Sequence, residues 1–88
     1  MERNKVYEVI DTERDYQLQF EDKEQSHIVS SLNMGGILTA IRVNLSNAEK
    51  VWYSEKTPYQ DTTEYLRKIA ALCVKAAEDY GMKERIIK

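Results

Sequence analysis

The chain of 88 residues has one cysteine, one histidine, one proline and three glycines. A single cysteine cannot close an intrachain disulfide, and one cysteine with one histidine falls short of a four-ligand zinc site. A chain of this length buries only about 60% of its unfolded surface, so its own apolar core is small. We therefore expect a single domain, residues 1–88, that is stabilised by self-association.

The sequence also lacks the run of roughly 20 apolar residues that crosses a bilayer. Its first ten residues, MERNKVYEVI, do not contain the long apolar segment of a secretory signal, so we expect a cytoplasmic protein. The 13 basic and 15 acidic residues give a net charge of -2, and the basic ones are scattered. General nucleic-acid binding is not expected, because it requires a basic surface that neutralises many phosphates.

Motifs for catalysis and cofactor binding are absent as well. His27 has serines nearby but no Gly-x-Ser-x-Gly elbow, and the sequence contains no Walker, Rossmann or zinc-knuckle pattern. Cys73 occupies an apolar position of a predicted helix, which favours a core residue over a nucleophile. We predict no enzyme activity, no cofactor and no metal site.

Residues 1–32 are predicted to form an N-terminal arm and a polar loop. The stretch K-V-Y-E-V-I at residues 5–10 contains four side chains that favour β-structure, which indicates a short strand or extended arm. From Asp11 onward the chain is polar and has no clean periodicity, which is typical of a long loop.

A first long helix is predicted over residues 33–55, with Asn33 as its cap. Its apolar side chains recur at alternating spacings of four and three, as in a heptad seam. These positions are Met34, Leu38, Ile41, Leu45, Ala48 and Trp52.

A second helix is predicted over residues 61–81. Asp61 and Glu64 have the spacing of a capping box, and Gly81 is a typical helix end. Its seam positions are Leu66, Ile69, Cys73, Ala76 and Tyr80.

Two heptad seams joined by a short connector predict an antiparallel helical hairpin. Each apolar stripe is wider than one neighbouring helix can cover. We therefore expect a mainly α fold with a short N-terminal extended arm, which assembles into a homo-oligomeric helical bundle.

The densest polar cluster is E-R-D-Y-Q at residues 13–17. Arg14 can bind a phosphate in bidentate fashion, Tyr16 can stack on a base, and the other side chains can bond to sugar or base edges. The alternative is a solvated turn with an internal ion pair. Together with one residue of the basic C-terminal segment, the candidate ligand-binding residues are Glu13, Arg14, Asp15, Tyr16, Gln17 and Arg85.

Three stretches resemble a family of small bacteriophage proteins. They are V-Y-E-V-I-D-T-E-R-D-Y-Q at residues 6–17, the helix from Gly35 to Trp52, and L-R-K-I-A-A-L-C-V-K-A-A-E-D-Y-G at residues 66–81. In size, helical content and lack of catalytic groups the chain is also similar to phage anti-CBASS and anti-Thoeris sponges. This resemblance implies an anti-defence protein that sequesters a nucleotide signal in the cytoplasm of the host cell.

Our leading hypothesis from the sequence is a phage-encoded, non-catalytic sponge that binds a small nucleotide-derived anion, such as a cyclic nucleotide or ADP-ribose-type signal, between subunits. The alternative is a protein–protein inhibitor or adaptor that acts on a host enzyme through the hairpin face. A third hypothesis is an enzyme that acts on nucleotides through Glu13 and Asp15.

Overall fold

A computed structural model describes residues 1–21, 33–54 and 58–87. Within these ranges the chain forms three helices and no strand: α1 (Arg3–Glu21), α3 (Met34–Ser54) and α4 (Pro58–Tyr80). The predicted helical fold class is confirmed. His27 and its neighbours lie outside the described residues.

The predicted extended arm at residues 5–10 is wrong, and so is the loop over residues 11–21, because both belong to α1. The face of α1 that is turned toward α4 contains Ile10, Glu13, Arg14 and Gln17, at the spacings of three and four that define one side of a helix. Since the middle of this face is charged, the apolar periodicity that would predict a helix is interrupted. Packing of this face outweighs the β-favouring side chains of the first turns.

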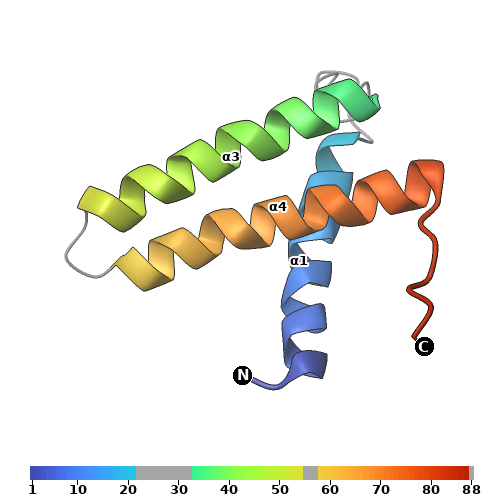
Figure 1. Ribbon diagram of the computed structural model, residues 1–88, viewed down its shortest axis with the longest axis horizontal. Helices are drawn as coiled ribbons and strands as arrows, with labels where there is room; N and C mark the ends of the chain where they lie inside the picture. The colour runs from blue at the N-terminus through green and yellow to red at the C-terminus, as the bar shows by residue number, and fades with distance from the viewer. Residues whose placement is uncertain (22–32, 55–57, 88) are drawn as a thin grey trace.

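The predicted antiparallel hairpin is present, with α3 and α4 lying side by side (Figure 1). The start of α3 meets the end of α4, where the backbone N–H of Met34 donates a hydrogen bond of 3.1 Å to the Tyr80 hydroxyl. At the opposite end, the rings of Trp52 and Tyr59 pack edge to face with centroids 5.2 Å apart. The two helices are therefore in register over their full length.

The ends of the hairpin helices are set by local signals. Asn33 caps α3 as predicted, because its Oδ1 accepts a hydrogen bond of 2.9 Å from the backbone N–H of Gly36. The predicted start of the second helix at Asp61 is three residues late, since α4 begins at Pro58. Proline suits the first helical position because it has no amide hydrogen to satisfy. Asp61 lies in the first turn instead, where a negative charge favours the helix dipole.

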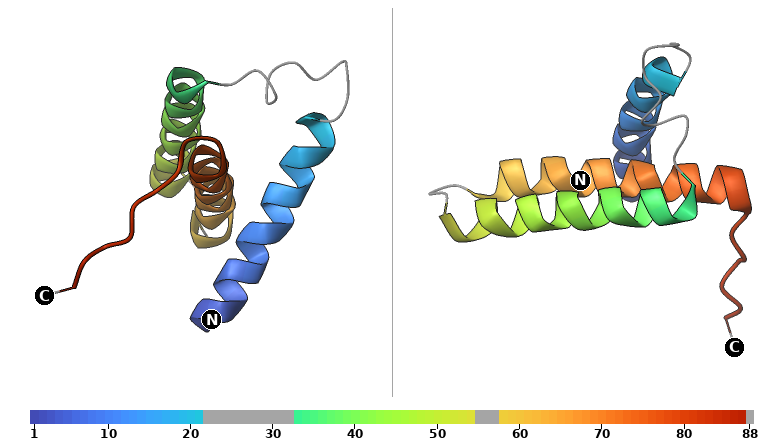
Figure 2. Two further views of the ribbon diagram at one scale, coloured as in Figure 1. Left: turned by 90° about the vertical axis from the view of Figure 1, so that its right-hand side faces the viewer. Right: turned by 90° about the horizontal axis from the view of Figure 1, so that it is seen from above.

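Helix α4 lies between the other two helices, with α3 along one side and α1 crossing the other (Figure 2). The buried apolar residues of the described chain are Ile37, Ala48, Ala71 and Leu72. Two of these four are alanines, and Ile37 is the largest fully buried side chain. Over the described residues, this core is small even for a domain of this length.

Helix α4 ends where Gly81 adopts a φ of 84°, and the Gly81 N–H donates a hydrogen bond of 2.8 Å to the carbonyl of Ala77. This left-handed conformation costs other residues about 1–2 kcal/mol. We expect Gly81→Ala to lower the free energy of unfolding by about that amount. A Cβ added there meets no atom within 4 Å, so a steric clash does not contribute. The loss of stability would therefore come from the backbone conformation alone.

The matched control is Gly35→Ala, which introduces the same methyl group within α3. There the backbone is helical and the new Cβ meets only the Asn33 Oδ1, at 3.4 Å. Because alanine favours a helix over glycine, we expect no loss of stability at this position. Urea denaturation measures both variants, and equal losses at the two glycines would contradict the assignment of Gly81 as the helix stop.

Candidate functional site

Two ion pairs join the predicted polar cluster of α1 to α4. The Arg14 Nε donates to Glu78 Oε1 at 2.9 Å, and its Nη2 donates to Glu78 Oε2 at 3.3 Å. The Arg67 Nε donates to Glu13 Oε1 at 2.8 Å. Each helix therefore contributes one acid and one base, and the acid of each helix faces the base of the other.

The two ion pairs are asymmetric in their burial. The side chains of Glu13 and Arg14 are only 8% and 6% exposed, whereas those of Arg67 and Glu78 are 33% and 47% exposed. A guanidinium that contacts both oxygens of a carboxylate forms a strong and directional pair. Removing one partner of a buried pair is costly, because the remaining charge loses its compensation. The two pairs consequently fix where α1 crosses α4.

The six predicted ligand-binding residues are not brought together by this arrangement. Glu13 and Arg14 are turned toward α4, while Asp15 and Tyr16 are exposed. Arg85 lies in the segment that follows α4 and is also exposed. The alternative interpretation of a solvated turn is wrong, since residues 13–17 lie within a helix.

Gln17 and Tyr16 have different surroundings, although they are adjacent. The Gln17 Oε1 is buried and has no hydrogen-bond partner among the described residues. The ring of Tyr16 packs edge to face on Phe20, with centroids 4.9 Å apart, and remains half-exposed. A role for these side chains in ligand binding stays a prediction.

Sequence reasoning missed Arg67 and Glu78 as partners of the cluster. Both lie on the side of α4 that also contains Ala71 and Val74, at successive spacings of four, three and four. This row predicts a second contact face on α4, separate from the seam toward α3. This row contains an acid and a base, and the polar cluster of α1 contains an acid and a base as well. That match could have predicted ion pairs between the two helices.

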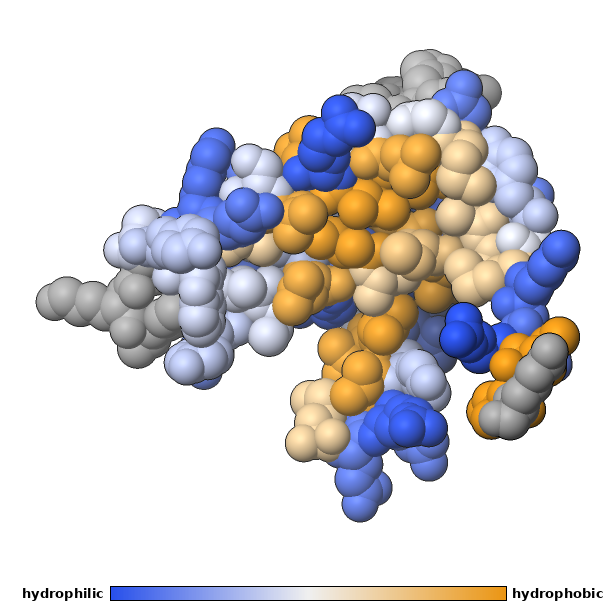
Figure 3. Space-filling model, in the orientation of Figure 1, coloured by the Kyte–Doolittle hydropathy of each residue, from blue (hydrophilic) through white to orange (hydrophobic). Residues whose placement is uncertain are grey.

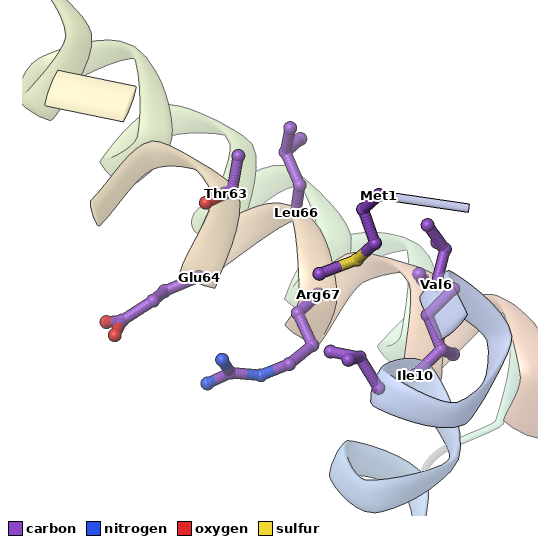
Figure 4. Close-up of a pocket in the computed structure, with 9 residues that line it drawn as sticks. Met1, Val6, Ile10, Thr63, Glu64, Leu66 and Arg67 are labelled. Carbon is purple, nitrogen blue, oxygen red and sulfur yellow. The ribbon is translucent and has the colours of Figure 1, made fainter. Parts of the chain in front are cut away.

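A groove of about 540 Å³ lies beside the Arg67–Glu13 pair, between the first half of α1 and α4. Its walls are mainly apolar, with Val6 and Ile10 from α1 and Leu66 from α4, and Met1 lies between the two helices (Figure 4). We call this feature the α1–α4 groove.

Polar atoms are found at the rim of the α1–α4 groove. In Figure 4 the side chains of Glu64 and Arg67 extend to the same side of α4. Arg67 is paired with Glu13, whereas Glu64 has no ion-pair partner in the described part of the chain. The groove therefore combines an apolar interior with one uncompensated negative charge.

Other kinds of site find little support in the described ranges. They contain no group of three or more His, Cys, Asp or Glu side chains that could hold a metal ion. Cys73, predicted to be a core residue, is exposed, as is Leu66, which lies on the same side of α4. None of the three described helices is long and apolar enough to cross a membrane.

No protein-family model, curated protein or solved structure matches this chain. The resemblance to phage proteins stays a prediction from the residues that carry it. The function is therefore inferred from the geometry of the helices and their exposed surfaces.

A double-mutant cycle tests whether the ion pairs hold α1 on α4. We expect Glu13→Ala and Arg67→Ala to show a coupling energy of about 1–3 kcal/mol, because their charges meet in a partly buried interface. Urea denaturation of the wild type, both single variants and the double variant measures this energy.

The control is the exposed pair of Lys5 and Glu8 within α1, whose charged atoms are 3.2 Å apart. Exposed pairs at this helical spacing contribute little, so we expect a coupling energy below about 0.5 kcal/mol. Equal coupling in the two cycles would show that the contact between α1 and α4 adds nothing to the pair.

Proposed function

We propose that this protein is a non-catalytic binding protein that self-associates and acts through contact with other protein surfaces. The observation that supports this proposal is a row of exposed, mostly apolar side chains that recur every seven residues along α3 and α4. We call it the heptad row. Its members are Leu38, Leu45, Trp52, Tyr59, Leu66, Cys73 and Tyr80.

Both halves of the heptad row belong to one side of the hairpin. Side chains seven residues apart lie on the same side of a helix, so each half forms a single line. The ring contact between Trp52 and Tyr59 joins the two lines at one end. At the other end Tyr80 reaches the first residue of α3. Figure 3 shows a broad apolar area over α3 and α4 that extends onto α1.

A second copy of the chain is the surface that fits the heptad row. Apolar residues at heptad spacing interlock with the same pattern on another helix pair, which gives a four-helix bundle. A twofold axis would let the row on one copy meet the same row on the other. Such pairing would add apolar contacts to a core in which Ile37 is the largest fully buried side chain among the residues that the structure describes.

The charges of α1 favour contact with proteins over capture of a nucleotide. Glu13 and Arg14 are the groups that would bind sugar and phosphate, but both are bonded to α4. Freeing Arg14 for a ligand would break the bidentate pair with Glu78. We therefore favour an inhibitor or adaptor that binds another protein over the sponge that the sequence suggested.

Sedimentation of the wild type and two variants tests self-association. We expect the wild type to sediment as a dimer or larger species of its 10.3 kDa chain. Leu45→Glu should raise the dissociation constant at least about tenfold, because it places a charge in an apolar interface. The midpoint of urea unfolding of the wild type should also rise with protein concentration.

The matched control is Val43→Glu. Val43 is 55% exposed and Leu45 is 45% exposed, but Val43 lies about 200° away around α3 and outside the heptad row. We expect Val43→Glu to leave the dissociation constant unchanged. A wild-type protein that stays monomeric, or equal effects of the two variants, would contradict the proposal.

A second candidate function is the capture of a nucleotide-derived anion between subunits, which the exposure of Tyr16 and Arg85 favours. Isothermal titration against cyclic dinucleotides, cyclic trinucleotides and cyclic ADP-ribose isomers tests it. Binding should be lost in Tyr16→Ala, which removes a ring able to stack on a base, and kept in Tyr53→Ala, which removes a more exposed ring from α3. Absence of binding across this panel would remove this candidate.

A further inference from the structure

The segment that follows α4 carries apolar side chains with little to pack on. Residues 82–87 leave the helical body as an extended segment (Figures 1 and 2). Ile86 and Ile87 are 78% and 92% exposed, and Met82 is exposed as well. Two adjacent isoleucines at this exposure indicate a segment that binds elsewhere. We call residues 82–87 the C-terminal segment.

We propose that the C-terminal segment of one copy binds in the α1–α4 groove of a second copy. This proposal rests on the self-association proposed above and adds the site at which residues 82–87 of the partner dock. The groove offers apolar walls for Ile86 and Ile87, and its volume of about 540 Å³ lies within the range of sites that enclose small ligands.

The charges of the two surfaces are complementary. Glu64 lies at the rim of the groove without an ion-pair partner among the described residues, while the charge of Arg67 is already compensated by Glu13. The C-terminal segment contains Lys83 and Arg85 with a single acid between them. A segment with net positive charge thus meets the Glu64 carboxylate at the rim, which favours this pairing.

The reach of the chain favours exchange between copies over docking within one copy. Leu66, in the wall of the groove, precedes Gly81 by fifteen helical positions, which cover roughly 22 Å. Ile86 follows Gly81 by five residues, which span at most about 18 Å when fully extended. Ala70, the groove residue of α4 nearest to Gly81, is eleven positions away, or roughly 16 Å. A segment that ran straight back along its own α4 would therefore reach only the near edge of the groove and would stop short of Leu66.

An antiparallel second copy removes this shortfall. When the α4 helices of two copies run in opposite directions, the end of one lies beside the start of the other. The C-terminal segment then begins close to the partner's groove. Leu66 belongs to both the heptad row and the groove wall, so the two contacts form one continuous interface. A twofold axis makes the exchange reciprocal.

Disulfide trapping between two differently substituted chains tests the exchange. Both chains carry Cys73→Ser, which removes the native thiol; one also carries Val6→Cys in the groove and the other Ile86→Cys in the C-terminal segment. After mixing and mild oxidation, we expect a disulfide-linked dimer whose linked peptides contain these two positions. The control replaces Val6→Cys by Tyr53→Cys, an exposed position outside the groove, and should give no such link.

The double variant Ile86→Asp with Ile87→Asp provides an independent measurement. Sedimentation should show a dissociation constant raised at least about tenfold, because two isoleucines no longer bury apolar surface. The control is the double variant Val43→Asp with Tyr53→Asp, which places the same two charges on exposed positions of α3 outside the groove and the heptad row, and should leave the constant unchanged. A wild-type dimer without the specific cross-link, whose dissociation constant does not respond to the double variant, overturns the exchange and leaves the proposed self-association intact. A wild-type monomer overturns both proposals.

Discussion

The arrangement of this protein depends on the two ion pairs that hold α1 across α4. The inner face of α1 offers few large apolar side chains, because Glu13 and Arg14 occupy its middle. The charge of Glu13 is compensated by Arg67, and the charge of Arg14 by Glu78. Both pairs form only when α1 crosses α4 at one position along the helix. Burial of charge adds less to stability than apolar packing of equal size, but a displaced crossing would leave buried charges unpaired. The pairs thus select the placement of α1, and that placement creates the α1–α4 groove.

The position of α4 between its neighbours determines which surfaces remain uncovered. Because α3 and α1 pack on different sides of α4, the three helices do not close around a common core (Figure 2). The side of α4 that contains Leu66, Cys73 and Tyr80 is left open, and the adjoining edge of α3 is open with it. In a closed three-helix bundle this side would be the interior. Here this side has the apolar composition of a protein interior but is exposed to solvent. Exposed apolar faces of this kind favour association between helical chains.

Local features of the sequence predicted the hairpin well and α1 poorly. Asn33 and Gly81 were recognised because a cap and a helix stop depend only on neighbouring residues. The heptad pattern predicted which helix sides are apolar, yet it could not set the rotation of each helix, so Ile37 rather than Leu38 faces the core. The ion pairs join residues 54 and 64 positions apart, and no local pattern connects such positions. For that reason the polar cluster at residues 13–17 suggested a ligand site, although its two most chemically useful side chains face another helix.

The use of charge inside the protein is one reason for the protein-binding function proposed above. Arg14 and Glu13 would be strong ligands for phosphate or sugar if they faced solvent. Instead, their charged groups form ion pairs with α4 that keep α1 in place. What remains at the surface is apolar area over α3, α4 and the start of α1, together with the apolar end of the C-terminal segment (Figure 3). Apolar surfaces bind through shape and area and do not distinguish small charged ligands well. Other helices and extended peptides fit such a surface, and in the self-association that we propose a second copy of the chain supplies both.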